Sequence, residues 1–113
     1  MSLGSCVSVI IRLPNGVEWF RANWIFRQLA KDVRAFSSDN RDVHVAVERA
    51  EAYGILDLQS MDARTSADLV SAFRHVAKET ADGGIEGWRP SDSQGREMYL
   101  RSLSELAELI AKY

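Results

Sequence analysis

The spacing of the apolar residues changes once along this chain, and that change limits the folds the chain can adopt. Residues 6–13, CVSVIIRL, are rich in β-branched side chains and alternate with a period of two, which is typical of a strand. Pro14-Asn15-Gly16 follows, and an Asn-Gly pair tolerates the positive φ angles of tight hairpin turns. With residues 17–20 as the returning strand, the sequence predicts a short N-terminal β-hairpin. Such a hairpin must pack on other elements to be stable.

From residue 23 onward the apolar residues recur every three or four positions, which is the period of an amphipathic helix. The first such stripe covers residues 23–36. Residues 37–40, SSDN, are all N-cap types, so a second helix is expected to begin there and to end at Gly54. The alternation V-H-V-A-V within it would also suit a strand, so both readings stay open for this segment.

The rest of the chain holds two further helical stripes. A third helix is expected to begin at Asp62 or Thr65 and to end at Gly83, and a last one to run from about Ser93 to the end. Residues 55–61, ILDLQSM, are too few for a helix and too apolar for a free loop. They are interpreted as an extended connector that lies across the core.

These elements predict an α+β fold that is mainly helical, with a short N-terminal β-hairpin packed on about four amphipathic helices. A chain of 113 residues suits one domain, residues 1–113, with residues 1–5 expected to be a disordered leader.

The charge and cysteine content exclude several functional classes. Lys and Arg number 14 against 16 Asp and Glu, and this acidic balance argues against nucleic-acid binding, which needs a basic surplus. No apolar run is long enough to cross a membrane. Cys6 is the only cysteine, so no internal disulfide can form, and a cytoplasmic location is expected. No phosphate-binding or dinucleotide-binding glycine motif is present, so no cofactor is expected.

The two histidines stand in similar pentapeptides, HVAVE and HVAKE, which pair His44 with Glu48 and His75 with Glu79. Each pair has the i, i+4 spacing that places two side chains on one helix face, and four such ligands on neighbouring helices would suit zinc or iron. Both pairs, however, lie about 120–160° from the apolar stripes of their helices at about 100° per residue. They are therefore interpreted as solvated pairs, with a metal site as the alternative.

Other candidate residues also allow both a functional and a purely structural interpretation. Asp57 and Asp62 flank the connector and could form a catalytic carboxylate pair. Asp57, however, is expected to point outward between two leucines, and Asp62 suits a helix N-cap, so catalysis is not favoured. Arg27, Lys31 and Arg34 form a basic line opposite the apolar stripe of the first helix. This line is a candidate site for an acidic partner, with a solvated helix face as the favoured interpretation.

The last helix has an apolar arc that covers about 200° of its circumference, wider than docking on one core requires. One flank of the arc carries Leu100, and the other carries Met98 and Leu109. A domain of this size is not expected to cover both flanks, so we predict a homodimer whose interface includes these three residues, with the Met98 and Leu109 flank favoured. The alternative is that the hairpin or the segment around Trp88 covers that flank within one molecule.

We recognise no family signature in the sequence, and its function is open. We favour a small, non-enzymatic interaction or regulatory domain that acts through its helical surface as a homodimer. The alternative is a small metal-binding protein or enzyme that uses the two His-x-x-x-Glu pairs.

Overall fold

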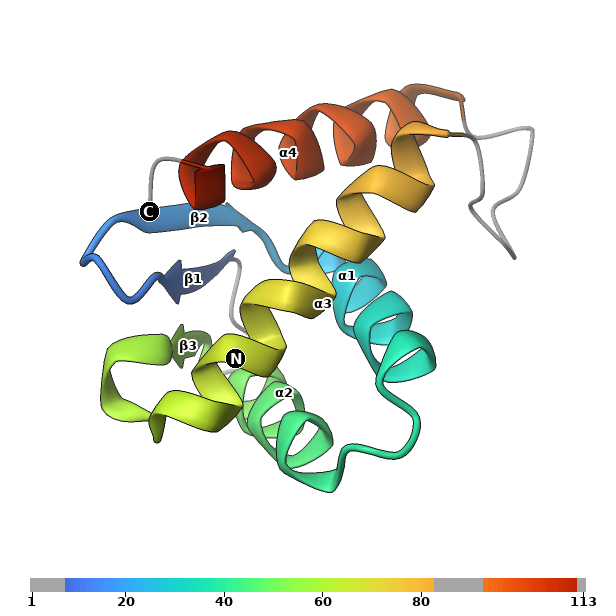
Figure 1. The fold of residues 1–113 in the computed structure, drawn as a ribbon. Coiled ribbons are helices and arrows are strands. Elements are labelled where there is room, and N and C mark those ends of the chain that lie inside the picture. The colour runs from blue at the N-terminus through green and yellow to red at the C-terminus, as the bar shows by residue number, and fades with distance from the viewer. Residues whose placement is uncertain (1–7, 83–92, 112–113) are drawn as a thin grey trace.

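The computed structural model describes residues 8–82 and 93–111. Within them the chain forms three strands, four α-helices and one short 3-10 helix, η1 (Figure 1). In chain order the elements are β1 (Ser8–Arg12), β2 (Glu18–Ala22), α1 (Asn23–Phe36), α2 (Arg41–Tyr53), β3 (Ile55–Asp57), η1 (Leu58–Ser60), α3 (Ala63–Ala81) and α4 (Ser93–Ala111). The predicted α+β, mainly helical fold with an N-terminal hairpin is confirmed. The predictions on residues 1–5, Cys6, Gly83 and Trp88 fall outside the described residues.

The hairpin forms where the local sequence predicts it. β1 and β2 pair antiparallel, and the backbone N–H of Leu13 donates to the carbonyl of Val17 over 2.8 Å to close the turn. Gly16 has a φ of 88°, a left-handed value that favours glycine. The side chain of Asn15 accepts a hydrogen bond from the N–H of Val17, so both residues of the Asn-Gly pair are used by the turn.

The segment predicted as a connector contains a third strand. β3 pairs parallel with β1, so the strand order is β2-β1-β3 and β3 lies at an edge of the sheet. Gly54, at a φ of 82°, ends α2 and turns the chain so that its carbonyl accepts a hydrogen bond from the N–H of Ile10 over 3.0 Å. Leu56 and Leu58 are buried in the core, which explains the apolar character of this segment.

The second helix is formed as predicted, and the strand interpretation of V-H-V-A-V is wrong. The side chain of Asn40 accepts a hydrogen bond from the N–H of Val43 over 3.2 Å and thereby caps the start of α2. Val43, Val47 and Ala50 face the core at helical spacing. Local caps at both ends thus select the helix over the strand.

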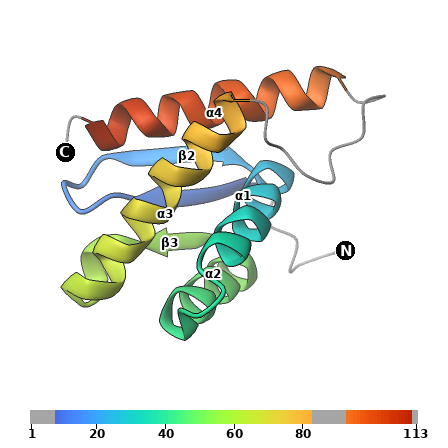
Figure 2. The ribbon, with the colours of Figure 1, turned by 45° about the vertical axis from the view of Figure 1, so that its right-hand side comes forward.

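The helices pack on one face of the sheet, and the other face is more open. Figures 1 and 2 show α3 crossing the sheet and α4 running beside β2. Val9, Ile11 and Trp19 are buried on the covered face. On the opposite face Phe20 is 57% exposed and pairs with Ile10.

Two buried aromatic side chains attach α4 to the rest of the domain. The indole Nε1–H of Trp19 donates to the carbonyl of Ser102 over 3.0 Å, and the hydroxyl of Tyr99 donates to Asp32 over 2.6 Å. Burial and the neighbouring Asp32 carboxylate both raise the pKa of the Tyr99 hydroxyl. Of the described helices, none has the length and apolar character needed to cross a membrane.

Candidate functional site

A hollow runs along the outer side of α2. We call it the α2 groove; it has a volume of about 870 Å³ and is open to solvent. One wall is α2, and the other is formed by β3, η1 and the first turn of α3. The lining residues are Arg41, Asp42, Val45, Ala46, Arg49, Tyr53, Ile55, Leu56, Asp57, Ser60, Met61, Asp62 and Thr65.

The α2 wall carries a regular row of exposed side chains. Every fourth residue of the helix from its first position faces the groove, in a row that we call the α2 stripe: Arg41, Val45, Arg49 and Tyr53. Val45 is 41% exposed and Tyr53 is 76% exposed, so both present apolar surface to solvent. The stripe thus alternates a cation with an apolar or aromatic group along the whole helix.

The facing wall offers apolar surface and backbone groups. Ile55 is 38% exposed, and Met61 is half-buried against the core. Because Gly54 directs its carbonyl toward β1, the next residue, Ile55, directs its own N–H and carbonyl away from β1. This side of β3 is an unpaired sheet edge within the described residues.

Most of the carboxylates in the groove are already bound within the protein. Asp57 forms an ion pair with Arg12 at 3.0 Å. Asp62 caps α3, with its carboxylate accepting hydrogen bonds from the N–H of Thr65 at 3.1 Å and from the Thr65 hydroxyl at 2.9 Å. These bonds to the charged form lower the pKa of Asp62. The capping role predicted for Asp62 is therefore confirmed.

The arginines of the groove differ from these carboxylates. Among the described residues, neither Arg41 nor Arg49 forms an ion pair or a side-chain hydrogen bond. Asp42 is the one lining carboxylate without such a bond in the described part of the chain, and it lies in the first turn of α2, where a helix favours negative charge. With respect to the described residues, the groove therefore presents two guanidinium groups and one carboxylate that have no internal bond.

This groove is not evident from the sequence alone. Arginine and apolar residues recur with i, i+4 spacing from Arg41 to Tyr53, but this row lies on the outer face of the helix, where its sequence alone does not distinguish a groove from a solvated surface. The second wall depends on where residues 55–62 lie, and that follows only from the pairing of β3 with β1.

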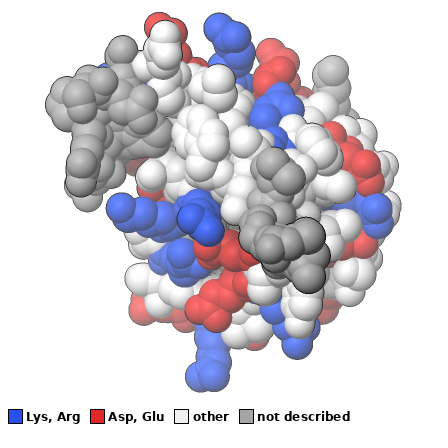
Figure 3. All heavy atoms as spheres, turned by 180° about the vertical axis from the view of Figure 1, so that it is seen from behind, with Lys and Arg blue, Asp and Glu red and all other residues white. Residues whose placement is uncertain are grey.

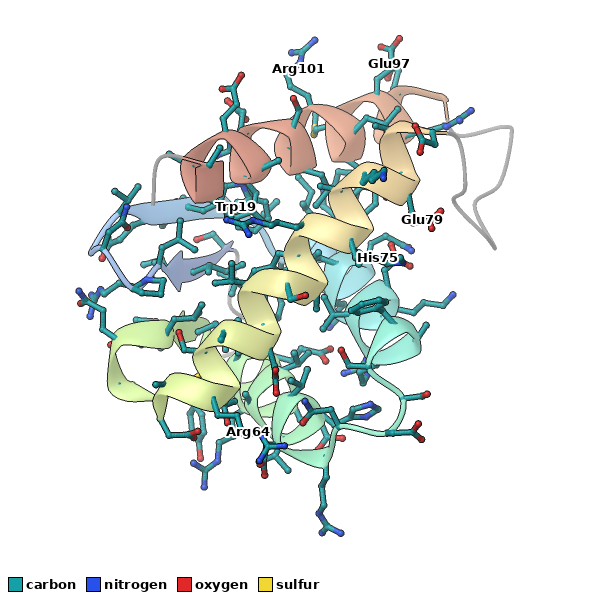
Figure 4. All side chains as sticks on the ribbon, viewed as in Figure 1. Trp19, Arg64, His75, Glu79, Glu97 and Arg101 are labelled. Carbon is teal, nitrogen blue, oxygen red and sulfur yellow. The ribbon has the colours of Figure 1, made fainter. Side chains whose placement is uncertain are left out.

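The two histidines contact neighbouring residues at the end of α1 and at the start of the turn that follows it. The Nε2 atom of His44 lies 2.9 Å from the carbonyl oxygen of Ser37, so this half-buried ring binds backbone. The ring of His75 stacks on that of Phe36, and its Nε2 atom lies 3.5 Å from a carboxylate oxygen of Glu79. In Figure 4 His75 and Glu79 both project from α3 on the side of α1. The described residues contain no group of three or more His, Cys, Asp or Glu side chains placed to hold a metal, and Glu48 is exposed.

The three residues of the predicted basic line on α1 differ in their contacts. Arg34 forms an ion pair with Glu51 at 2.6 Å and so links α1 to α2. Arg27 and Lys31 are exposed and have no ion-pair partner among the described residues. Nearby, Arg21 pairs with Glu105 of α4 and lies over the ring of Trp19, 5.6 Å from its centroid.

The residues predicted for a dimer interface differ in exposure. Met98 is 52% exposed, whereas Leu109 is half-buried and packs against the core. Leu100, on the other flank, lines a smaller hollow between α3 and α4. Figure 4 shows Glu97 and Arg101 projecting from α4 away from the body of the protein. The reverse view in Figure 3 shows an uncharged area bordered by acidic and basic side chains.

Comparison with known proteins gives no relative: the chain matches no protein-family model, and neither a curated protein nor a solved structure is significantly similar to it.

Proposed function

We propose that this protein is a non-enzymatic interaction domain that binds a segment of a partner protein in the α2 groove. One observation carries the proposal. The groove joins exposed apolar and aromatic groups, Val45, Tyr53 and Ile55, with two arginines that have no partner in the described part of the chain. Aromatic residues and arginine are enriched at protein interfaces, and such side chains supply most of the binding energy there.

The groove is also firmly supported. α2 is capped by Asn40 at its start and by Gly54 at its end, and the ion pair between Arg34 and Glu51 links it to α1. A wall held in this way loses little conformational freedom when a ligand binds, which favours affinity. We place this activity in the cytoplasm because a chain whose only cysteine is Cys6 needs no oxidising compartment.

Self-association is the second part of the proposal. Met98 on α4 leaves half of its surface exposed, and such a side chain on the flank of a wide apolar arc favours contact with another copy. A two-fold dimer through this flank would leave the α2 groove of each copy free, because none of the α4 residues lines it.

The metal-binding or enzymatic alternative has less support. To bind a metal ion together with Glu48, His44 would have to give up its contact with the Ser37 carbonyl and turn toward Glu48. His75 would have to leave its contact with Phe36.

Site-directed photo-crosslinking tests the groove. Benzoylphenylalanine is placed at Val45, inside the groove, or at Glu108, an exposed position on α4, and the protein is irradiated in a lysate of its native host. We expect an adduct from Val45 that is absent from Glu108. Equal labelling from both positions, or none from Val45, would contradict the proposal.

A further inference from the structure

We infer that the α2 groove selects an extended, acidic segment whose acidic and apolar side chains alternate toward α2. This inference rests on the proposed function and names the chemical class of the partner. Three features of the groove support it: the charge of its free groups, the spacing of the α2 stripe and the unpaired edge of β3.

The free charges favour an acidic ligand. Arg41 and Arg49 have no ion-pair partner among the described residues, whereas Asp57 and Asp62 are bound to Arg12 and to Thr65. A guanidinium group forms paired hydrogen bonds with a carboxylate, so two free arginines on one wall form two matching sites for acidic side chains. Asp42 opposes this attraction but leaves a positive excess.

The spacing of the stripe matches an extended chain. Successive members of the α2 stripe are four helical residues apart, which is about 6 Å along the axis. Every second residue of an extended chain points the same way, at intervals of about 6.5 Å. A segment that lies along α2 therefore places one side chain opposite each stripe residue in turn. The side chains of the segment that lie opposite Arg41 and Arg49 are acidic, and those that lie opposite Val45 and Tyr53 are apolar.

The end of the stripe leads to the edge of the sheet. Tyr53 is followed by Gly54 and then by Ile55, whose backbone N–H and carbonyl point away from β1. A segment that has passed Tyr53 meets these groups and can add hydrogen bonds of the strand-pairing type. An extended backbone uses these groups, whereas a helix has its own N–H and carbonyl groups already paired.

A selection with random peptides tests the inference without assuming one sequence. A phage-displayed random-peptide library is selected on the wild-type protein, and the recovered peptides are synthesised and their affinities measured by fluorescence polarisation. We expect the recovered peptides to be acidic, with acidic and apolar residues two positions apart. The double variant Arg41→Glu/Arg49→Glu should bind them about tenfold more weakly or worse, because attraction becomes repulsion.

The matched control is Arg74→Glu/Lys78→Glu, which changes the net charge equally but lies on α3, outside the α2 groove. It should keep wild-type affinity. Circular dichroism checks both variants, and Arg41→Gln/Arg49→Gln replaces the first if charge reversal unfolds α2. Recovered peptides without an acidic excess, equal losses in both double variants, or no recovered peptide would overturn the inference. A groove-specific crosslink at Val45 together with any of these results would leave the proposed function standing, which separates the two failures.

Discussion

The imidazole ring of His75 lies stacked on the phenyl ring of Phe36, with 4.0 Å between the ring centroids and 21° between the ring planes. This contact joins the middle of α3 to the last residue of α1. Ser37, the next residue, accepts a hydrogen bond from His44 of α2 if Nε2 carries the proton. The two histidines thus contact consecutive residues, Phe36 and Ser37, from two different helices.

The ring stack should contribute measurably to stability. We expect Phe36→Ala and His75→Ala each to lower the free energy of unfolding by about 1 kcal/mol, since stacked rings contribute that much beyond the area they bury. Urea denaturation measures the change, and Arg74→Ala, at an exposed position next to His75, serves as the control. Additive losses in the Phe36→Ala/His75→Ala double variant would show that the two rings do not interact.

Removal of the Tyr99 hydroxyl should weaken the attachment of α4. Tyr99→Phe removes the donor to one oxygen of the Asp32 carboxylate, while Gln28 still donates to the other, and we expect a loss of about 1 kcal/mol in the free energy of unfolding at neutral pH. Tyr53→Phe, in which an exposed hydroxyl is removed, should cost almost nothing. Similar losses in the two variants would contradict the assigned role of the bond to Asp32.

The same residue predicts a dependence on alkaline pH. Burial and the Asp32 carboxylate raise the pKa of Tyr99 in the folded protein above the value of about 10 that tyrosine has in an unfolded chain. Below about pH 10 the Tyr99 hydroxyl is protonated in both states, and it makes its full contribution to the free energy of unfolding. Above that pH the unfolded chain releases the Tyr99 proton while the folded protein keeps it, so stability falls as the pH rises. Urea titrations between about pH 8 and pH 11 should show a steeper fall for wild type than for Tyr99→Phe. Parallel curves would refute this prediction.

Zinc titration distinguishes the metal alternative from the interaction domain. The structure commits His44 to a backbone carbonyl and His75 to an aromatic ring, whereas a zinc site needs three or four converging ligands. We expect calorimetric titrations of wild type and of His44→Ala/His75→Ala to be alike. A stoichiometric site in wild type that the double variant lacks would favour the metal-binding alternative.

Self-association is best tested at Met98, because Leu109 packs against the core and its replacement would also disturb folding. We expect wild type to sediment as a dimer at micromolar concentration and Met98→Glu to sediment as a folded monomer. Val45→Glu makes the same change on α2, away from α4, and should remain dimeric. A monomeric wild type, or a dimer that survives in Met98→Glu, would exclude this interface.

The fold was predictable wherever a local signal decided it. Asn15 and Gly16 set the hairpin turn, and Asn40 and Gly54 set the ends of α2, because capping and turn geometry act within a few residues. The inward apolar stripes followed from helical periodicity alone.

The pairing of β3 could not be predicted in this way. Ile55 lies 45 positions after Ile10, its pairing partner, and nothing in the three-residue sequence of β3 indicates which strand it will join. The α2 groove was missed for the same reason, since one of its walls is β3. The ion pair between Arg34 and Glu51 could not be predicted either, because only the packing of α1 on α2 brings the two side chains together.

The position of β1 between β2 and β3 has a consequence for the order of folding. β2 follows β1 after a short turn and can pair with it at once. β3 follows β1 only after β2, α1 and α2, and this intervening chain must fold back before β3 can reach β1. Closing a long loop costs entropy that only later contacts repay, so the parallel pairing is expected to form late. The same step completes the second wall of the α2 groove. A partial opening that releases β3 alone would therefore abolish the groove while the hairpin remains intact.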